Sequence, residues 1–121
     1  MREASERFAQ DGKVTVDWER LWQIAPMPFD ETLIEFCDEA IREGCGKSHR
    51  LPSGPLHDAA EVARAGVPKM AMMFTQSLHG ISHNKIEDTQ EEHLELAARV
   101  FDRMAAKTMA WIRESLGSDF G

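Results

Sequence analysis

Hydrophobic and polar residues alternate with a period of two in the N-terminal part of the chain. From Val14 to Ile24, apolar side chains occupy the even-numbered positions except at Arg20, and mostly polar side chains occupy the others. Such alternation is typical of a β-strand with one buried face. A short helix over residues 2–10 precedes the strand, with Asp11-Gly12 as its stop. The segment Pro26-Met27-Pro28 ends the strand, because proline lacks a backbone N–H and restricts the residue before it.

The pattern then alternates between helical spacing and short apolar runs. Asp30 is placed to cap a helix that ends near Gly44, and further helices are expected over about 57–65 and 90–116. A weak strand is expected over Lys47–Leu51. The run Met70–Phe74 is apolar throughout, as in a strand buried on both faces of a parallel sheet. The stripe of the last helix expected to face the core comprises Leu94, Ala97, Phe101, Met104, Ala105, Thr108, Ile112 and Leu116.

This order of elements predicts an α/β fold with an incomplete sheet and flanking helices, preceded by a strand that belongs to another sheet. Two strands with three helices make less than a usual sheet, so the chain resembles part of a larger fold. The proline segment is the best candidate boundary. It separates residues 1–25 from residues 26–121.

The composition of the chain argues against several classes of protein. The 121 residues carry a formal net charge of −7, from 14 Lys and Arg against 21 Asp and Glu. This acidic balance argues against nucleic acid or an anionic membrane as the main partner. No apolar run approaches the roughly 18–20 residues of a membrane span. The first residues lack the apolar region of a secretion signal, and the two cysteines have neither a redox nor a zinc-ribbon spacing, so a cytoplasmic location is expected.

Three of the five histidines are candidates for chemistry. His57 and Asp58 follow a Pro/Gly loop at a helix start, where backbone amides suit a substrate carboxylate; a dipole-favouring surface pair is the alternative. His79 and His83 have the spacing of two zinc ligands on a helix, but the glycine and isoleucine between them favour a loop. His83 is the stronger candidate, because ligands bind beyond the carboxyl ends of strands in α/β sheets.

Other catalytic signatures are missing from the sequence. It contains no phosphate-binding loop, dinucleotide fingerprint, nucleophile elbow or C-x-x-C motif. The residues alone therefore predict an α/β segment with one histidine site.

Two segments taken together resemble a known family. Residues 51–60 (LPSGPLHDAA) and 80–84 (GISHN) are similar to the C-terminal signatures of metal-dependent amidases of the M20-type metallopeptidase clan. These amidases include N-carbamoyl-L-amino-acid hydrolases, ureidopropionases and allantoate amidohydrolases. The Gly66-Val67-Pro68 segment and the acidic residues ahead of the last helix fall in the family's order. The resemblance covers most of the chain but only the C-terminal portion of a family member.

The resemblance implies a catalytic α/β domain with an inserted lid, or dimerisation, domain. Residues 1–25 would be the end of the lid, and residues 26–121 would be the closing part of the catalytic domain. His83 would be a ligand of a two-metal site, usually zinc or manganese. The substrate loop would comprise Gly54, Leu56, His57 and Asp58. Pro55 and Leu56 replace the small residues that the family commonly has there, which leaves the substrate open.

The implied function is hydrolysis of C–N bonds in linear amides, with an N-carbamoyl-L-amino acid or related ureido compound as substrate. The family's other metal ligands and its general-base glutamate have no counterpart in this sequence. We therefore assign no catalytic residue to this chain, and we expect the isolated chain to be inactive and to hold no metal tightly. The alternative is a non-catalytic remnant that acts as a binding or assembly module.

The chain is also expected to be a homo-oligomer. A strand over Met70–Phe74 would need neighbours on both edges, and the strand over Val14–Ile24 would add a second open edge. Parent enzymes of the family that the chain resembles commonly dimerise through the lid, which agrees with this expectation.

Overall fold

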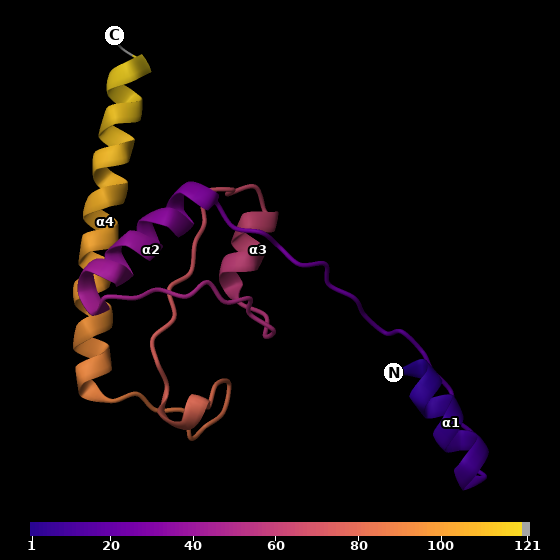
Figure 1. The fold of residues 1–121 in the computed structure, drawn as a ribbon. Helices are drawn as coiled ribbons and strands as arrows, with labels where there is room; N and C mark the ends of the chain where they lie inside the picture. The colour runs from indigo at the N-terminus through magenta and orange to yellow at the C-terminus, as the bar shows by residue number, and fades with distance from the viewer. Residues whose placement is uncertain (120–121) are drawn as a thin grey trace.

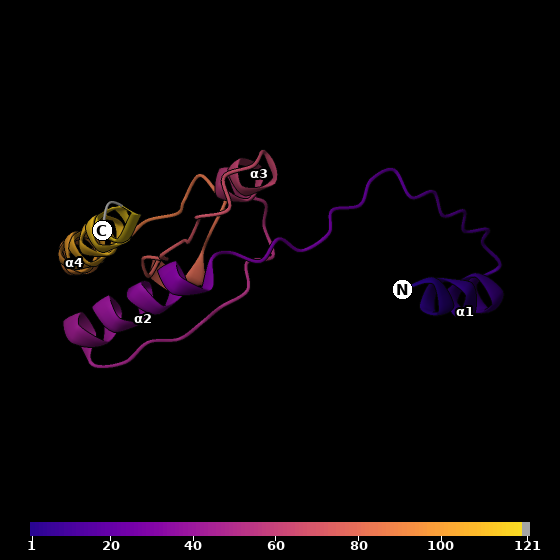
Figure 2. The same ribbon diagram turned by 90° about the horizontal axis from the view of Figure 1, so that it is seen from above.

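The computed structural model describes residues 1–119, in which the chain is helical (Figure 1). The elements are α1 (Arg2–Gly12), α2 (Glu31–Cys45), α3 (Asp58–Arg64), the short 3-10 helix η1 (Leu78–Gly80) and α4 (Glu91–Asp119). Helix α1 lies apart from the others, at the end of a long extended segment, as Figures 1 and 2 show from two directions. None of the described helices is both long enough and apolar enough to cross a membrane.

The predicted α/β fold with an incomplete sheet is wrong, since residues 1–119 contain no β-strand. The three segments predicted as strands, 14–24, 47–51 and 70–74, run as coil between the helices (Figure 1). A strand requires a neighbouring strand that pairs with its backbone N–H and C=O groups. Apolar periodicity shows which side chains avoid water but does not supply that neighbour.

Helix α2 packs against the middle of α4, and this pair forms the core of the described chain. The two helices approach closely at Gly44, where a Cβ atom would lie 2.5 Å from Cγ2 of Val100. Phe36 and Trp111 meet edge to face with ring centroids 5.9 Å apart. The buried hydrophobic residues all lie on these two helices and are Leu33, Cys37, Ala40 and Val100.

The start of α2 is set by a local cap, as predicted. The Asp30 carboxylate accepts a hydrogen bond from the Leu33 N–H at 3.0 Å. This bond, together with the ammonium group of Lys69, lowers the pKa of Asp30. The helix ends at Gly46 with φ of 83°, a left-handed conformation that glycine adopts without strain. The helix runs one residue beyond the predicted stop at Gly44, and Gly44 lies in the contact with Val100.

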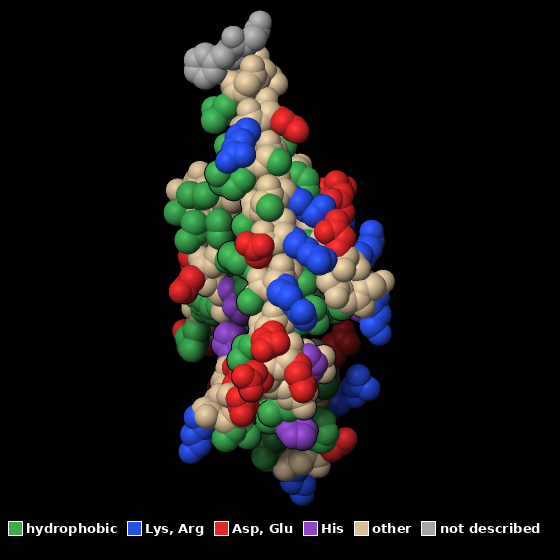
Figure 3. Space-filling view, turned by 90° about the vertical axis from the view of Figure 1, so that its left-hand side faces the viewer, with side chains coloured by type: hydrophobic (Ala, Val, Ile, Leu, Met, Phe, Trp, Pro, Cys, Tyr) green, Lys and Arg blue, Asp and Glu red, His purple; other side chains and the backbone are tan. Residues whose placement is uncertain are grey.

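The predicted core stripe of α4 is correct only in part, since Ala97, Met104, Ala105 and Thr108 are partly buried and its other four residues are exposed. Helix α2 contacts the face of α4 that carries Val100 and Trp111. Figure 3 looks onto α4 and shows hydrophobic side chains at the surface beside it. The large apolar residues of the predicted stripe that stay 41–61% exposed are Leu94, Phe101, Ile112 and Leu116.

Candidate functional site

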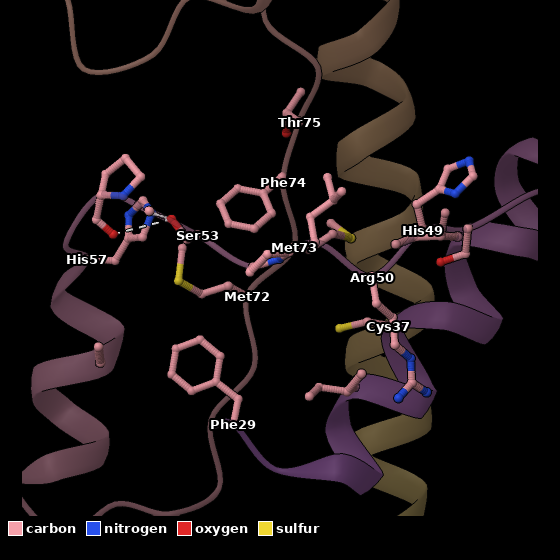
Figure 4. A pocket seen from close by; sticks show the side chains of 18 of the residues that line it. Phe29, Cys37, His49, Arg50, Ser53, His57, Met72, Met73, Phe74 and Thr75 are labelled. Carbon is pink, nitrogen blue, oxygen red and sulfur yellow. Dashed lines mark hydrogen bonds between the residues drawn. The ribbon is translucent and has the colours of Figure 1, made fainter. Parts of the chain in front are cut away.

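An open hollow with a volume of about 1230 Å³ lies between the α2–α4 pair and α3. The segment 72–77 runs along it, so Met72 and Phe74 belong to its lining (Figure 4). In the same view, the side chains of Met72, Phe74 and Phe29 all lie on the side of this segment that faces α3. The hollow is therefore mainly apolar, with histidine and serine side chains at the end nearest α3.

His57 occupies that end of the hollow. It is the N-cap residue of α3, where the loop 52–57 gives way to the helix, and its side chain is half-buried. Its Nε2 atom lies 2.6 Å from Oγ of Ser53, and its ring lies 5.8 Å from that of Phe74 (Figure 4). The predicted helix after this loop is confirmed, although α3 spans only seven residues.

His83 lies in a turn that follows η1. Its backbone has φ of 56°, a left-handed conformation that histidine adopts more readily than most residues. Its N–H donates to Oε2 of Glu87 at 2.8 Å, and Oδ1 of Asn84 accepts from the N–H of Ile86 at 3.1 Å. The turn is thus held by its own side chains, and it presents an exposed imidazole.

The structure brings the two sequence motifs together at these histidines. The rings of His57 and His83 lie 5.3 Å apart between centroids, at an interplanar angle of 62°. Both border a second hollow of about 710 Å³, which Gly54 also lines. Leu56 lines the larger hollow, and Asp58 is the exposed first residue of α3. His57, His83 and Gly54 therefore share one site, and Leu56 and Asp58 flank it.

His79 does not join this site. It lies in η1 with φ of 56°, and it lines neither hollow. The loop expected between His79 and His83 is confirmed. The two residues are not on successive turns of one helix, as a zinc-binding pair with this spacing would be.

A metal centre does not fit within the described chain alone. Residues 1–119 contain no group of three or more His, Cys, Asp or Glu side chains that could hold a metal ion. Structural zinc sites have four protein ligands, and catalytic zinc sites have three. His57 and His83 supply two imidazoles at most, so any metal here needs ligands from outside these residues.

Asp38 is a structural residue of the site that the sequence analysis missed. Its carboxylate is nearly buried and accepts from Oγ of Ser48 at 2.6 Å and from Nε of Arg50 at 2.7 Å. These hydrogen bonds lower the pKa of Asp38. Glu31 binds the other side of the Arg50 guanidinium at 2.5 Å. The network fixes the segment 46–50 along α2 and so sets where the loop 52–57 begins.

Asp30 fixes the start of the segment that lines the hollow. Its backbone N–H donates to the carbonyl of Met70 at 2.9 Å, and its carboxylate pairs with Nζ of Lys69 at 3.0 Å. That ammonium group also lies 5.0 Å from the ring centroid of Trp111. The first residues of the segment 69–77 are thereby tied to both α2 and α4.

Comparison with known proteins places the chain in a family of hydrolases. Residues 5–107 match the model of Peptidase family M20/M25/M40, and the chain belongs to this family. The resemblance drawn from the two motifs is therefore confirmed. No solved structure matches the chain.

The chain is also similar in sequence to a curated protein. The chain is 28% identical over 96 residues to the N-carbamoyl-L-amino acid amidohydrolase of Geobacillus stearothermophilus. The aligned part covers 79% of this chain and 23% of that protein. The chain thus spans about a quarter of the length of this relative.

Proposed function

We propose that this chain supplies part of the active site of a metal-dependent hydrolase that cleaves C–N bonds in linear amides. The substrate class would be N-carbamoyl-L-amino acids or related ureido compounds. The observation that carries the proposal is the 5.3 Å approach of His57 to His83, because it joins the two motifs that resemble amidase signatures. The similarity to a curated N-carbamoyl-L-amino acid amidohydrolase supports the substrate class.

Each motif has its own role in the proposal. His83 would be one ligand of a zinc or manganese ion, with the remaining ligands supplied from outside this chain. Its imidazole is exposed on a left-handed turn and not on a helix. Gly54 and His57 would contact the substrate, with Ser53 orienting the His57 ring through the 2.6 Å hydrogen bond. Leu56 and Asp58 would border the substrate from the same loop. A reducing compartment such as the cytoplasm suits the two free cysteines.

A chimeric enzyme tests this assignment. In it, the aligned stretch of the Geobacillus stearothermophilus amidohydrolase is replaced by this chain, and release of ammonia from an N-carbamoyl amino acid is measured. We expect His83→Asn to lower turnover by more than about 100-fold, a larger loss than removal of an outer-shell partner of a metal ligand causes. Asparagine tolerates the left-handed backbone, so the substitution tests the imidazole rather than the turn.

His79→Asn is the matched control, because His79 has the same φ of 56° but lines neither hollow. We expect the control chimera to keep its activity and its bound metal. Equal activity of the two variants would refute the role of His83. A folded chimera that binds metal without any hydrolysis would favour the alternative of a binding or assembly module.

The isolated chain is expected to release no ammonia from these substrates, with or without added zinc or manganese, since its described residues do not assemble a metal centre. Metal-dependent turnover by the purified chain would contradict this expectation.

A further inference from the structure

The hydroxyl group of Ser53 contacts two groups of its own loop. Its Oγ atom lies 2.6 Å from Nε2 of His57 and 3.3 Å from the carbonyl oxygen of Pro55 (Figure 4). A hydroxyl group has one hydrogen to donate, and a carbonyl oxygen can only accept. Both contacts are hydrogen bonds at once only if the hydroxyl donates to Pro55 and the Nε2–H of His57 donates to the hydroxyl. In the neutral imidazole, this arrangement leaves Nδ1 without a proton, as an acceptor.

Two aromatic rings pack beside the His57 imidazole. The Phe74 ring lies 5.8 Å from it between centroids, at an interplanar angle of 57°, and the His83 ring lies 5.3 Å from it at 62°. A half-turn of the imidazole would put a carbon atom where Nε2 meets Ser53, so the hydrogen bond selects one of the two ring orientations. Within residues 1–119, this bond through Nε2 is the one side-chain hydrogen bond of His57. Nδ1 is therefore free to accept from a ligand.

The lining of the second hollow suits a neutral donor group beside His57. Within the described chain, no lysine or arginine lines this hollow, and its one carboxylate, that of Glu87, accepts from the N–H of His83 at 2.8 Å. An imidazole nitrogen without a proton accepts from an N–H group and has nothing to donate to a carboxylate. Linear amides and ureido compounds carry neutral N–H groups. The side chain of His57 therefore fits an N–H of such a ligand and not its carboxylate.

We propose that Ser53 is a positioning residue that keeps His57 in the Nε2–H tautomer, so that Nδ1 accepts a hydrogen bond from an N–H group of the substrate. The hydrogen bond that one ring nitrogen makes sets the protonation of the other. The tautomer depends on this chain alone. The assignment of the donor to a linear amide or ureido compound rests on the proposed function, so the tautomer and the substrate contact are tested separately.

Nitrogen NMR of the imidazoles in the full chain tests the tautomer. Spectra are recorded at about pH 9, above the range in which histidine usually titrates, and the His57 signals are identified as those that His57→Asn removes. The chain unfolded in urea is the reference, because both tautomers form there. In the folded chain, His57 should be protonated at Nε2 alone.

Ser53→Ala should return His57 towards the mixture of the unfolded chain, whereas Ser53→Thr, which keeps the hydroxyl, should not. Ser77→Ala is the matched control, because Ser77 lines both hollows but forms no side-chain hydrogen bond within residues 1–119. Circular dichroism checks that helix content is unchanged. A proton on Nδ1 in the folded wild type would overturn the proposal, as would a Ser53→Ala spectrum equal to that of the wild type or of Ser77→Ala.

Kinetics of the chimeric enzyme test the substrate contact. Ser53→Ala should raise KM for the N-carbamoyl amino acid by about 2–10-fold, as expected for the loss of one hydrogen bond, with kcat unchanged. Ser53→Thr and Ser77→Ala should keep the KM of the unsubstituted chimera. A lower kcat at unchanged KM would contradict a contact with the bound substrate. A chimera without activity would refute the proposed function and the substrate contact together, whereas the NMR spectra decide the tautomer in either case.

Discussion

The α2–α4 pair and the extended segment 13–21, called the arm, both carry large apolar side chains, but only the helix pair buries them. On the helix pair, Val100 is 3% exposed and Leu33 is 7% exposed. On the arm, Val14 and Trp18 remain 57% and 44% exposed. The helices satisfy their own backbone hydrogen bonds, so they need only a complementary surface, which Gly44 and Val100 provide. An extended segment needs a backbone partner as well. Regions of equal hydrophobicity therefore differ in what they require from the rest of the fold.

The largest expected effect on stability comes from a charge placed in the core of the helix pair, and the same charge on the arm is the control. Val100→Asp buries an unpaired carboxylate in the core of the chain, and we expect it to lower the free energy of unfolding by more than about 3 kcal/mol. Val14→Asp places the same group in an exposed part of the arm and should leave the stability of α2 and α4 unchanged. Urea titrations followed by circular dichroism measure both. Similar midpoints for the two variants would show that the helix pair is not the stable core.

A methyl group at Gly44 tests the close approach of the two helices. Gly44→Ala places a Cβ atom 2.5 Å from Cγ2 of Val100, so the Val100 side chain must shift or the helices must separate, and we expect a loss of about 1–3 kcal/mol. Gly117→Ala is the control within α4, because open space surrounds that position. The control should raise stability by up to about 1 kcal/mol through helix propensity. The two changes should have opposite signs in thermal unfolding, and a stabilising Gly44→Ala would contradict the packing described.

Asp38 tests how the coil between α2 and α3 is held. Asp38→Asn removes the charge that Arg50 and Ser48 bind, and we expect a loss of about 1–2 kcal/mol at neutral pH. The pKa of Asp38 is lowered in the folded chain, so its contribution is complete above the ordinary pKa of an aspartate. It disappears as the pH falls through the folded pKa. Stability measured against pH should therefore drop less steeply on acidification in Asp38→Asn than in the wild type.

Replacement of Lys107 should have the smallest effect on stability. Its ammonium group binds Glu43 at 2.9 Å and Glu39 at 3.1 Å on the surface of the helix pair, where ion pairs contribute little. Lys107→Met should lower stability only slightly, and only at low salt. In about 1 M NaCl, where the Debye length is about 3 Å, the difference from the wild type should vanish. A difference that persisted in high salt would show that packing of the lysine stem, not its charge, stabilises the pair.

Local interactions explain why the helices could be predicted from the sequence. Asp30 caps α2 through a residue only three positions away, as predicted, whereas the end of the helix was predicted at Gly44 and not at its C-cap Gly46. Such signals are complete within a few residues. The face of α4 that packs could not be predicted in this way, because it depends on contacts with another helix, such as the close approach of Gly44 to Val100.

The lack of a partner strand among residues 1–119 explains why the predicted sheet is wrong. The run Met70–Phe74 has the composition of a buried strand, but no strand among residues 1–119 pairs with it, and it is coil. The candidate site was predicted in part. The motifs pointed to His57 and His83, but their 5.3 Å approach depends on how two loops fold around Phe74, which no spacing in the sequence specifies. The role of Asp38 was missed, although a carboxylate beside the apolar face of a helix indicates a charged partner.

The burial of Cys37 on α2 has a consequence for the chemistry of the chain in solution. Burial raises the pKa of this thiol, and the neighbouring Asp38 charge raises it further, so little thiolate forms at neutral pH. Cys45 is exposed at the end of the same helix. An alkylating reagent should therefore modify Cys45 faster than Cys37. The ratio of the two rates therefore measures how strongly the folded chain protects the Cys37 thiol, without any substitution.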